Sequence, residues 1–157
     1  MNYFPKISII TITYNSEKTV EDTIMSVVSQ NYPSLEYLII DGGSKDKTLD
    51  IVEKYRDKIS FVVSEPDKGI SDAFNKGIKY ATGEIIGIIN SDDLLMPNAL
   101  QAVADAYEPS VEVYRGNLII WNFETGNKVR SIPAVKFPIY SFSKPAICHP
   151  STFVAKD

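Results

Sequence analysis

Two adjacent carboxylates, Asp92 and Asp93, follow one residue after the apolar segment 84–90. Two such charges about 4 Å apart repel each other by about 4 kcal/mol at an effective dielectric constant near 20. A divalent cation relieves this repulsion, and Mg²⁺ is typically held by one or two carboxylates together with substrate phosphates. The pair therefore predicts a site at which Mg²⁺ or Mn²⁺ bridges the protein to a nucleoside diphosphate, although one Asp could instead cap the turn while the other faces water.

Polar side chains also follow three other apolar segments, 6–13, 35–41 and 59–64. If these segments are parallel strands, their carboxyl ends meet at one edge of a sheet, which is where ligands bind in open α/β folds. Each polar residue alone has a plainer interpretation as a helix cap or turn residue, but together they indicate a binding site. The residues expected at this edge are Tyr14, Asn15, Asp41, Asp67, Lys68, Asp92 and Asp93.

Four repeats of a strand followed by a helix are expected to position these residues. The predicted strands, rich in apolar and β-branched residues, are 6–13, 35–41, 59–64 and 84–90. Apolar residues at helical spacing follow each strand, and the predicted helices are one that carries Val20 to Val28, 47–58, 70–81 and one that opens at Pro97. Such alternation predicts an α/β fold, with a mostly parallel sheet and helices on both faces.

Composition excludes several other classes of protein. The 16 basic residues are spread along a chain of net charge −4, which argues against a nucleic-acid partner. The single cysteine, Cys148, suits a reducing cytoplasm, and no apolar run approaches the ~18 residues of a transmembrane helix. Neither a glycine-rich dinucleotide fingerprint nor a P-loop is present, and no Cys/His cluster suggests zinc.

The motifs then resemble a known family. The segment ISIITITYNSEKTVEDTIMSVVSQNYPSLEYLIIDGGSKDKTLDIV, followed by SEPDKGISDAFNKGIKYATGEIIGIINSDD, is similar to the family 2 glycosyltransferases of GT-A fold. It looks especially like bacterial members that build cell-surface polysaccharides. The resemblance covers residues 6–107 almost continuously, and YRGN and CHPSTF look like later family segments with lower specificity.

The resemblance implies a role for each matching position. The base pocket would be formed by Tyr14, with the backbone of Ile12–Asn15, and by Asp41, which would accept a hydrogen bond from uracil or another base. The residues implied near the rest of the donor are Asp67 and Lys68 for the base or diphosphate, Asp92 for the ribose, Asp93 for the metal, and Asp72 for the donor sugar.

The catalytic base is the part of the family pattern that the sequence does not supply. No acidic motif after Asp93 matches it, and the first position of the DXD-type motif is Asn90. His149 is a candidate for the base, a metal ligand or an acceptor contact, and its alternative is a structural loop histidine. We expect one domain over 1–157, with 1–107 as the nucleotide-sugar-binding half and 108–157 as the start of an acceptor-side region that the chain does not complete.

The function implied is metal-dependent, inverting transfer of a sugar from a nucleoside-diphosphate sugar, with UDP favoured, to a saccharide or lipid-linked acceptor. The expected setting is the cytoplasm, including peripheral association with the inner face of the membrane, without a transmembrane segment. Two alternatives are a non-catalytic nucleotide-sugar-binding module and a sugar-nucleotide pyrophosphorylase. The second needs a Gly-rich basic loop after the first strand, and TYNSEK is not such a loop.

Overall fold

A six-stranded, mostly parallel sheet forms the body of the protein, as the computed structural model shows for residues 3–122, 124–132 and 149–156. The strand order is β3-β2-β1-β4-β8-β5. The strands of this sheet are β1 (Ile7–Thr13), β2 (Leu35–Asp41), β3 (Phe61–Ser64), β4 (Ile85–Asn90), β5 (Val113–Arg115) and β8 (Thr152–Ala155). The helices are α1 (Val20–Val28), α2 (Thr48–Lys54), α3 (Ile70–Tyr80) and α4 (Ala99–Asp105), with short 3₁₀ turns η1 (Arg56–Lys58) and η2 (His149–Ser151).

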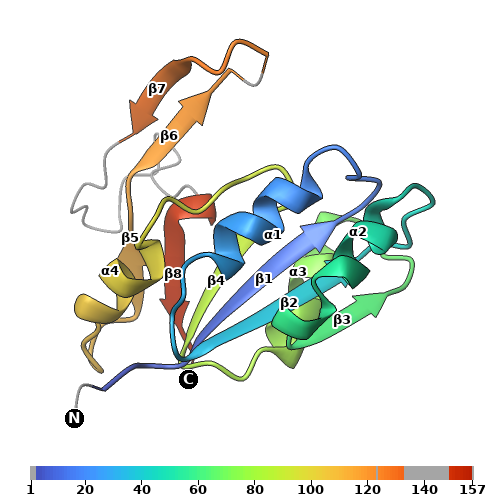
Figure 1. Cartoon of the computed structure of the whole chain (residues 1–157). Helices are drawn as coiled ribbons and strands as arrows, with labels where there is room; N and C mark the ends of the chain where they lie inside the picture. The colour runs from blue at the N-terminus through green and yellow to red at the C-terminus, as the bar shows by residue number, and fades with distance from the viewer. Residues whose placement is uncertain (1–2, 123, 133–148, 157) are drawn as a thin grey trace.

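Helices cover both faces of the sheet, which confirms the predicted fold class (Figure 1). All seven side chains of β1 are buried, because each face of the strand packs against its own layer. Ile7 and Ile9 belong to a core shared with α1, α2 and α4, whereas Ile10 and Ile12 belong to a core shared with α3. A fully buried parallel strand therefore has a continuous apolar sequence rather than an alternating one.

Two glycines allow layers to approach closely. A Cβ atom on Gly77 of α3 would lie 2.4 Å from Cγ2 of Ile10, and one on Gly87 of β4 would lie 2.6 Å from Cε1 of Phe153. Both positions therefore need glycine for packing, because a methyl group would overlap a buried side chain.

The C-terminal part of the described chain completes the sheet, which the sequence did not predict. Residues 133–157 were expected to be mostly irregular, but β8 pairs antiparallel with β4 on one side and with β5 on the other. Its four residues follow a Pro-rich segment, and so short a strand gives little periodic signal. Segment 113–132 likewise contains three strands rather than two, because β5 joins the main sheet while β6 (Leu118–Trp121) and β7 (Lys128–Ile132) form a separate hairpin that projects from the body (Figure 1).

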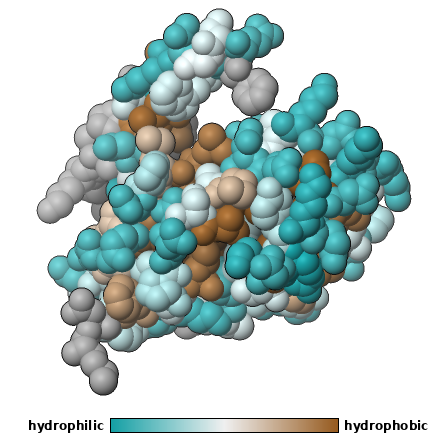
Figure 2. Space-filling view, viewed as in Figure 1, coloured by the Kyte–Doolittle hydropathy of each residue, from teal (hydrophilic) through white to brown (hydrophobic). Residues whose placement is uncertain are grey.

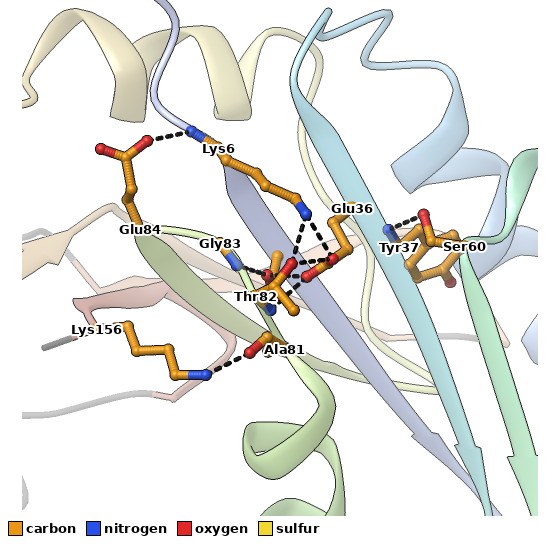
Figure 3. Close-up of polar contacts among 10 residues, drawn as sticks. Lys6, Glu36, Tyr37, Ser60, Ala81, Thr82, Gly83, Glu84 and Lys156 are labelled. Atoms are coloured by element: carbon orange, nitrogen blue, oxygen red, sulfur yellow. Dashed lines mark hydrogen bonds and ion pairs between the residues drawn. The ribbon is translucent and has the colours of Figure 1, made fainter.

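A polar network closes the amino ends of the strands, opposite the edge predicted to bind ligand (Figure 3). The carboxylate of Glu36 accepts hydrogen bonds from the Lys6 ammonium, from the Ser8 hydroxyl, and from both the backbone N–H and the hydroxyl of Thr82. Burial opposes ionisation of Glu36, but these hydrogen bonds outweigh it and lower its pKa to about 2. Polar bonding at this end therefore joins β1, β2 and the start of β4.

No helix among residues 3–122, 124–132 and 149–156 is long and apolar enough to span a bilayer.

Candidate active site

The carboxyl ends of the four parallel strands lie level with one another. Thr13 pairs with Asp41, Asp41 pairs with Ser64, and Ile12 pairs with Asn90. The loops that carry the predicted site residues therefore leave the sheet at one edge, as parallel register requires.

Asp41 is buried at this edge, with 1% of its surface exposed. Its Oδ2 atom accepts hydrogen bonds from the backbone N–H groups of Gly43 (3.0 Å) and Ser44 (2.9 Å) and from the hydroxyl of Ser64 (2.6 Å), and its Oδ1 atom accepts one from the Ser44 hydroxyl (2.5 Å). The carboxylate therefore organises the β2–α2 loop and ties it to β3. A contact between Asp41 and a base stays a prediction.

Tyr14, Gly42 and Asp67 meet beside Asp41, although they come from three different loops. A Cβ atom on Gly42 would lie 2.7 Å from Oδ2 of Asp67 and 3.4 Å from Cδ2 of Tyr14. Tyr14 is 61% exposed, so its side chain is accessible to a ligand. This arrangement places an exposed aromatic ring next to a carboxylate, which suits stacking of a base together with hydrogen bonding of its edge.

The β1–α1 and β2–α2 loops are held together by side chains. Asn15, at a positive φ of 49°, accepts a hydrogen bond from Lys45 N–H on Oδ1 and donates its own N–H to Ser44 Oγ. Further along, Ser16 N–H donates to the buried Thr48 hydroxyl. Ile12, by contrast, is 8% exposed and packs in the core, so only its backbone borders the site.

Asp92 and Asp93 occupy the turn after β4. Asp92 is exposed and Asp93 is half-buried, and Oδ2 of Asp93 accepts a hydrogen bond from Asn90 Nδ2 (3.0 Å). The preceding Ser91 shares a hydrogen bond of 2.7 Å with Ser16, which links this turn to the β1–α1 loop. A surface cavity of about 460 Å³ lies here, lined by residues of both segments and by Asp46.

The residues at this turn fit a hard divalent cation. They offer carboxylate oxygens, and no group of three or more His, Cys, Asp or Glu residues in the described parts of the chain could hold a metal by itself. A site with two carboxylates needs its other ligands from phosphate oxygens and water, which is the usual coordination of Mg²⁺ in nucleotide enzymes. Asp92 and Asp93 would hold the cation.

The β3–α3 loop carries Asp67 and Lys68 and continues into the helix that contains Asp72. Oδ1 of Asp67 accepts a hydrogen bond from Gly69 N–H (2.9 Å), and Oδ2 of Asp72 accepts one from Lys68 N–H (3.1 Å). Asp72 lies in the first turn of α3, where a carboxylate that reaches back to an earlier N–H stabilises a helix start. A contact between Asp72 and the donor sugar stays a prediction.

His149 reaches the neighbourhood of the site through the fold, despite its distance along the chain. Its backbone belongs to η2, which packs beside β4. Because β8 runs antiparallel to β4 with Phe153 opposite Gly87, the residues before β8 lie towards the carboxyl end of β4. The side chain of His149 lies outside the described part of the structure.

Several residues of this edge were not predicted from the sequence. Ser44 and Ser64 bind Asp41, and Thr23 of α1 donates its hydroxyl to the backbone oxygen of Asp93 (3.0 Å). An Asp side chain often accepts a hydrogen bond from the backbone two residues on, so the turn at Asp41 that brings in Gly43 could have been found from the sequence. Thr23 and Ser64 depend on contacts between segments far apart in the sequence.

Comparison with known proteins agrees with the fold. The sequence model of glycosyl transferase family 2 matches residues 8–155. EpsE of Bacillus subtilis (strain 168), named as a glycosyltransferase, is 30% identical over 156 residues, which cover 95% of this chain and 56% of EpsE. The chain thus spans about half the length of this relative.

Two solved structures share the architecture. The mannosyltransferase PcManGT from Pyrobaculum calidifontis, in complex with GDP-Man and Mn²⁺, aligns with a TM-score of 0.65 and 28% identity over 73% of this chain and 36% of its own. TarS 1–349 of S. aureus, in complex with UDP-GlcNAc, aligns with a TM-score of 0.57 and 34% identity over 64% of this chain and 30% of its own. The chain belongs to glycosyl transferase family 2.

Proposed function

We propose that this chain binds a nucleoside-diphosphate sugar, with UDP as the nucleotide, through a divalent cation, and that the protein transfers the sugar to a saccharide or lipid-linked acceptor for a cell-surface polysaccharide. The observation that carries the proposal is the meeting of Tyr14, Gly42 and Asp67 beside Asp41, at the edge where Asp92 and Asp93 also lie. The two aligned structures, one with UDP-GlcNAc and one with GDP-Man and Mn²⁺, support a nucleotide-sugar donor and a metal.

In the proposed reaction, the bond between the anomeric carbon and the diphosphate oxygen breaks while the acceptor hydroxyl oxygen attacks that carbon. The protein holds the base against Tyr14 and the loop organised by Asp41, and Asp92 and Asp93 would hold Mg²⁺ or Mn²⁺ at the diphosphate end of the donor. The bound cation would supply positive charge that stabilises the departing diphosphate. The acceptor proton passes to a general base, for which His149 is the candidate within this chain.

Exposed apolar side chains beside the carboxylates support an acceptor with an apolar part. Leu94 is 59% exposed and Met96 is 52% exposed. Met25, in the helix α1 that hydrogen-bonds this segment through Thr23 and Ser26, is 45% exposed. Figure 2 shows apolar surface in the middle of the face on which α1 lies, whereas α2 is covered by hydrophilic residues. A lipid-linked acceptor would bring its apolar portion next to this surface.

The donor part of the proposal is tested by thermal shift and calorimetry with a panel of nucleotides that includes UDP and GDP, each with Mn²⁺ and with excess EDTA. We expect UDP to raise the melting temperature only when the cation is present. A shift of equal size in EDTA would contradict the metal bridge, and a larger shift with GDP would change the proposed base.

The transfer part is tested with UDP-sugars and a lipid-linked or saccharide acceptor. No acidic motif after Asp93 matches the catalytic base of the family. Because general-base assistance typically raises the rate 10²–10⁴-fold, we expect this chain to bind donor but to transfer sugar poorly. Robust transfer that is lost on His149→Ala would instead identify His149 as the base, and robust transfer by both proteins would place the base elsewhere.

A further inference from the structure

The β3–α3 loop has to hold Asp67 and Lys68 in one position at the proposed site, yet it is built mostly from exposed residues. Lys68 and Gly69 are exposed, and Gly69 has a positive φ of 112°. Turns of this kind sample several conformations unless other contacts hold them. The residue that supplies such contacts here is Lys76, two turns along α3.

Lys76 contacts three acceptors on or next to this loop. Its ammonium lies 3.1 Å from Oε1 of Glu65, donates to the backbone oxygen of Pro66 at 3.2 Å, and lies 3.5 Å from Oδ2 of Asp72. The side chain is only 18% exposed, so these contacts are partly shielded from solvent. Asp72 in turn accepts the N–H of Lys68. A single cation therefore ties both ends of the loop to the helix.

The charge states favour this arrangement. Burial opposes the charge on Lys76, but the carboxylates of Glu65 and Asp72 outweigh burial and raise its pKa. The hydrogen bond from Lys68 N–H, together with Lys76, lowers the pKa of Asp72. Lys76 is therefore charged at neutral pH, and an ammonium has three N–H donors for the three acceptors that surround it.

We propose that Lys76 is a positioning residue of the donor site, which holds the β3–α3 loop so that Asp67 and Lys68 can bind the nucleotide. This inference rests on the proposed nucleotide-sugar function. Since its three donors are directed at Glu65, Pro66 and Asp72, Lys76 acts through the loop rather than by touching the diphosphate.

The test compares Lys76→Met with Lys79→Met, because both remove one ammonium from α3. Lys79 is exposed, and its ammonium lies 6.0 Å from the ring centroid of Tyr80 rather than at the loop. Calorimetry with UDP and Mn²⁺ should show Kd raised about tenfold by Lys76→Met, which is about 1.4 kcal/mol, and less than twofold by Lys79→Met. UDP lacks the sugar, so an effect on sugar contacts is excluded.

Two further measurements separate positioning from a general loss of stability. Amide hydrogen exchange should become faster at Lys68 and Gly69 in Lys76→Met, while the amides of β1 and β4 keep their protection. Asp72→Asn should weaken UDP binding in the same direction, and the double variant should lose less affinity than the sum of the two single losses, because both substitutions remove the contact between Lys76 and Asp72.

The outcomes distinguish the inference from the function on which it rests. If the parent chain binds UDP with Mn²⁺ and Lys76→Met binds it as Lys79→Met does, the positioning role is wrong and the proposed function stands. Unchanged exchange at Lys68 and Gly69, or fully additive effects of the two substitutions, would also overturn the role. Failure of the parent chain to bind any nucleotide would overturn both.

Discussion

The carboxylates of the candidate site differ in burial, and this difference separates their roles. Asp41 is buried and accepts four hydrogen bonds from the protein, so its first function is to shape the β2–α2 loop. Asp92 is exposed and Asp93 is half-buried, so both are accessible to a cation. Because four donors from the protein already bind the oxygens of Asp41, the pair after β4 is the one that offers carboxylate oxygens to an external cation.

The first prediction concerns Asp93. Asp93→Asn should lower the affinity for UDP and Mn²⁺ at least tenfold, because an amide is a far weaker ligand for a hard cation than a carboxylate. The melting temperature should stay the same or rise, since the substitution removes repulsion from Asp92. Calorimetry with the exposed Asp57→Asn as control checks this, and parent-like affinity in Asp93→Asn would show that the metal assignment is wrong.

The second prediction concerns Asp41. Asp41→Ala should destabilise the protein by about 1.5–3 kcal/mol, since it leaves buried donors without their charged acceptor, and it should also weaken UDP binding. Ser64→Ala removes one of the same hydrogen bonds but keeps the carboxylate. Urea unfolding and calorimetry of both variants check this. If Asp41→Ala lowers stability but UDP affinity matches that of Ser64→Ala, Asp41 is a loop cap only.

At the scale of elements, α1 positions the segment that carries the carboxylates. The Thr23 hydroxyl donates to Asp93 O, the Ser26 hydroxyl accepts Leu95 N–H at 3.1 Å, and the Gln30 side chain donates to Met96 O at 3.0 Å. Thr23 and Ser26 share one face of α1 because they are three residues apart, and Gln30 lies in the turn that follows the helix. These side chains thus satisfy backbone N–H and C=O groups of the segment after β4, which is not itself part of a strand.

The third prediction tests this contact through Thr23, which is fully buried. Thr23→Val keeps the shape of the side chain but removes the hydroxyl that fixes Asp93, so the concentration of Mn²⁺ needed for half-maximal UDP binding should rise about three- to tenfold. Thr11→Val is a matched control, because Thr11 is also fully buried and its hydroxyl hydrogen-bonds Tyr37 OH within the sheet, away from Asp93.

Both variants should lose about 1 kcal/mol of stability, since each loses one buried hydrogen bond. A manganese titration followed by UDP binding distinguishes them. Equal metal requirements in the two variants would show that Thr23 does not act on the site.

At the scale of the whole molecule, the sheet separates two polar regions with different purposes. The carboxyl edge keeps Tyr14 and Asp92 exposed to a ligand, whereas at the amino edge Glu36 is satisfied by Lys6, Ser8 and Thr82 (Figure 3). The polar groups of the amino edge therefore bind one another, while part of the carboxyl edge remains available to a ligand, which is where ligands bind in open α/β folds.

The fourth prediction is the pH dependence that Glu36 confers. Its pKa falls from 4.5 to about 2 on folding, so its contribution is complete above pH ~5 and is lost as the pH falls towards 2. The shift corresponds to stability on the order of 3 kcal/mol. Urea unfolding at pH 6 and pH 3 should show a smaller pH dependence in Glu36→Gln than in the parent, while the exposed Glu53→Gln should behave as the parent does.

Prediction from the sequence worked where a local pattern is enough. The continuous apolar runs of β1 and β4 are diagnostic of buried parallel strands, and the 3.6-residue spacing in α3 defines a helix, so fold class and the edge that gathers polar residues follow directly. Helix ends were less accurate: the predicted helix 47–58 is α2 followed by the separate turn η1, because Tyr55 leaves helical geometry.

Only the tertiary structure decided the features that join distant segments. Ser64 can donate a hydrogen bond to Asp41, and Thr23 can donate one to the backbone oxygen of Asp93, seventy residues away, only because the fold makes these segments neighbours. The same holds for β8, whose four residues become a strand because β4 and β5 offer it backbone partners on both sides. Local periodicity indicates which side of an element is apolar, but it contains no information about the partner. The sequence alone therefore determined the four strand-and-helix units and the edge at which their polar residues gather. Long-range hydrogen bonding determined β8 and the way that edge is held.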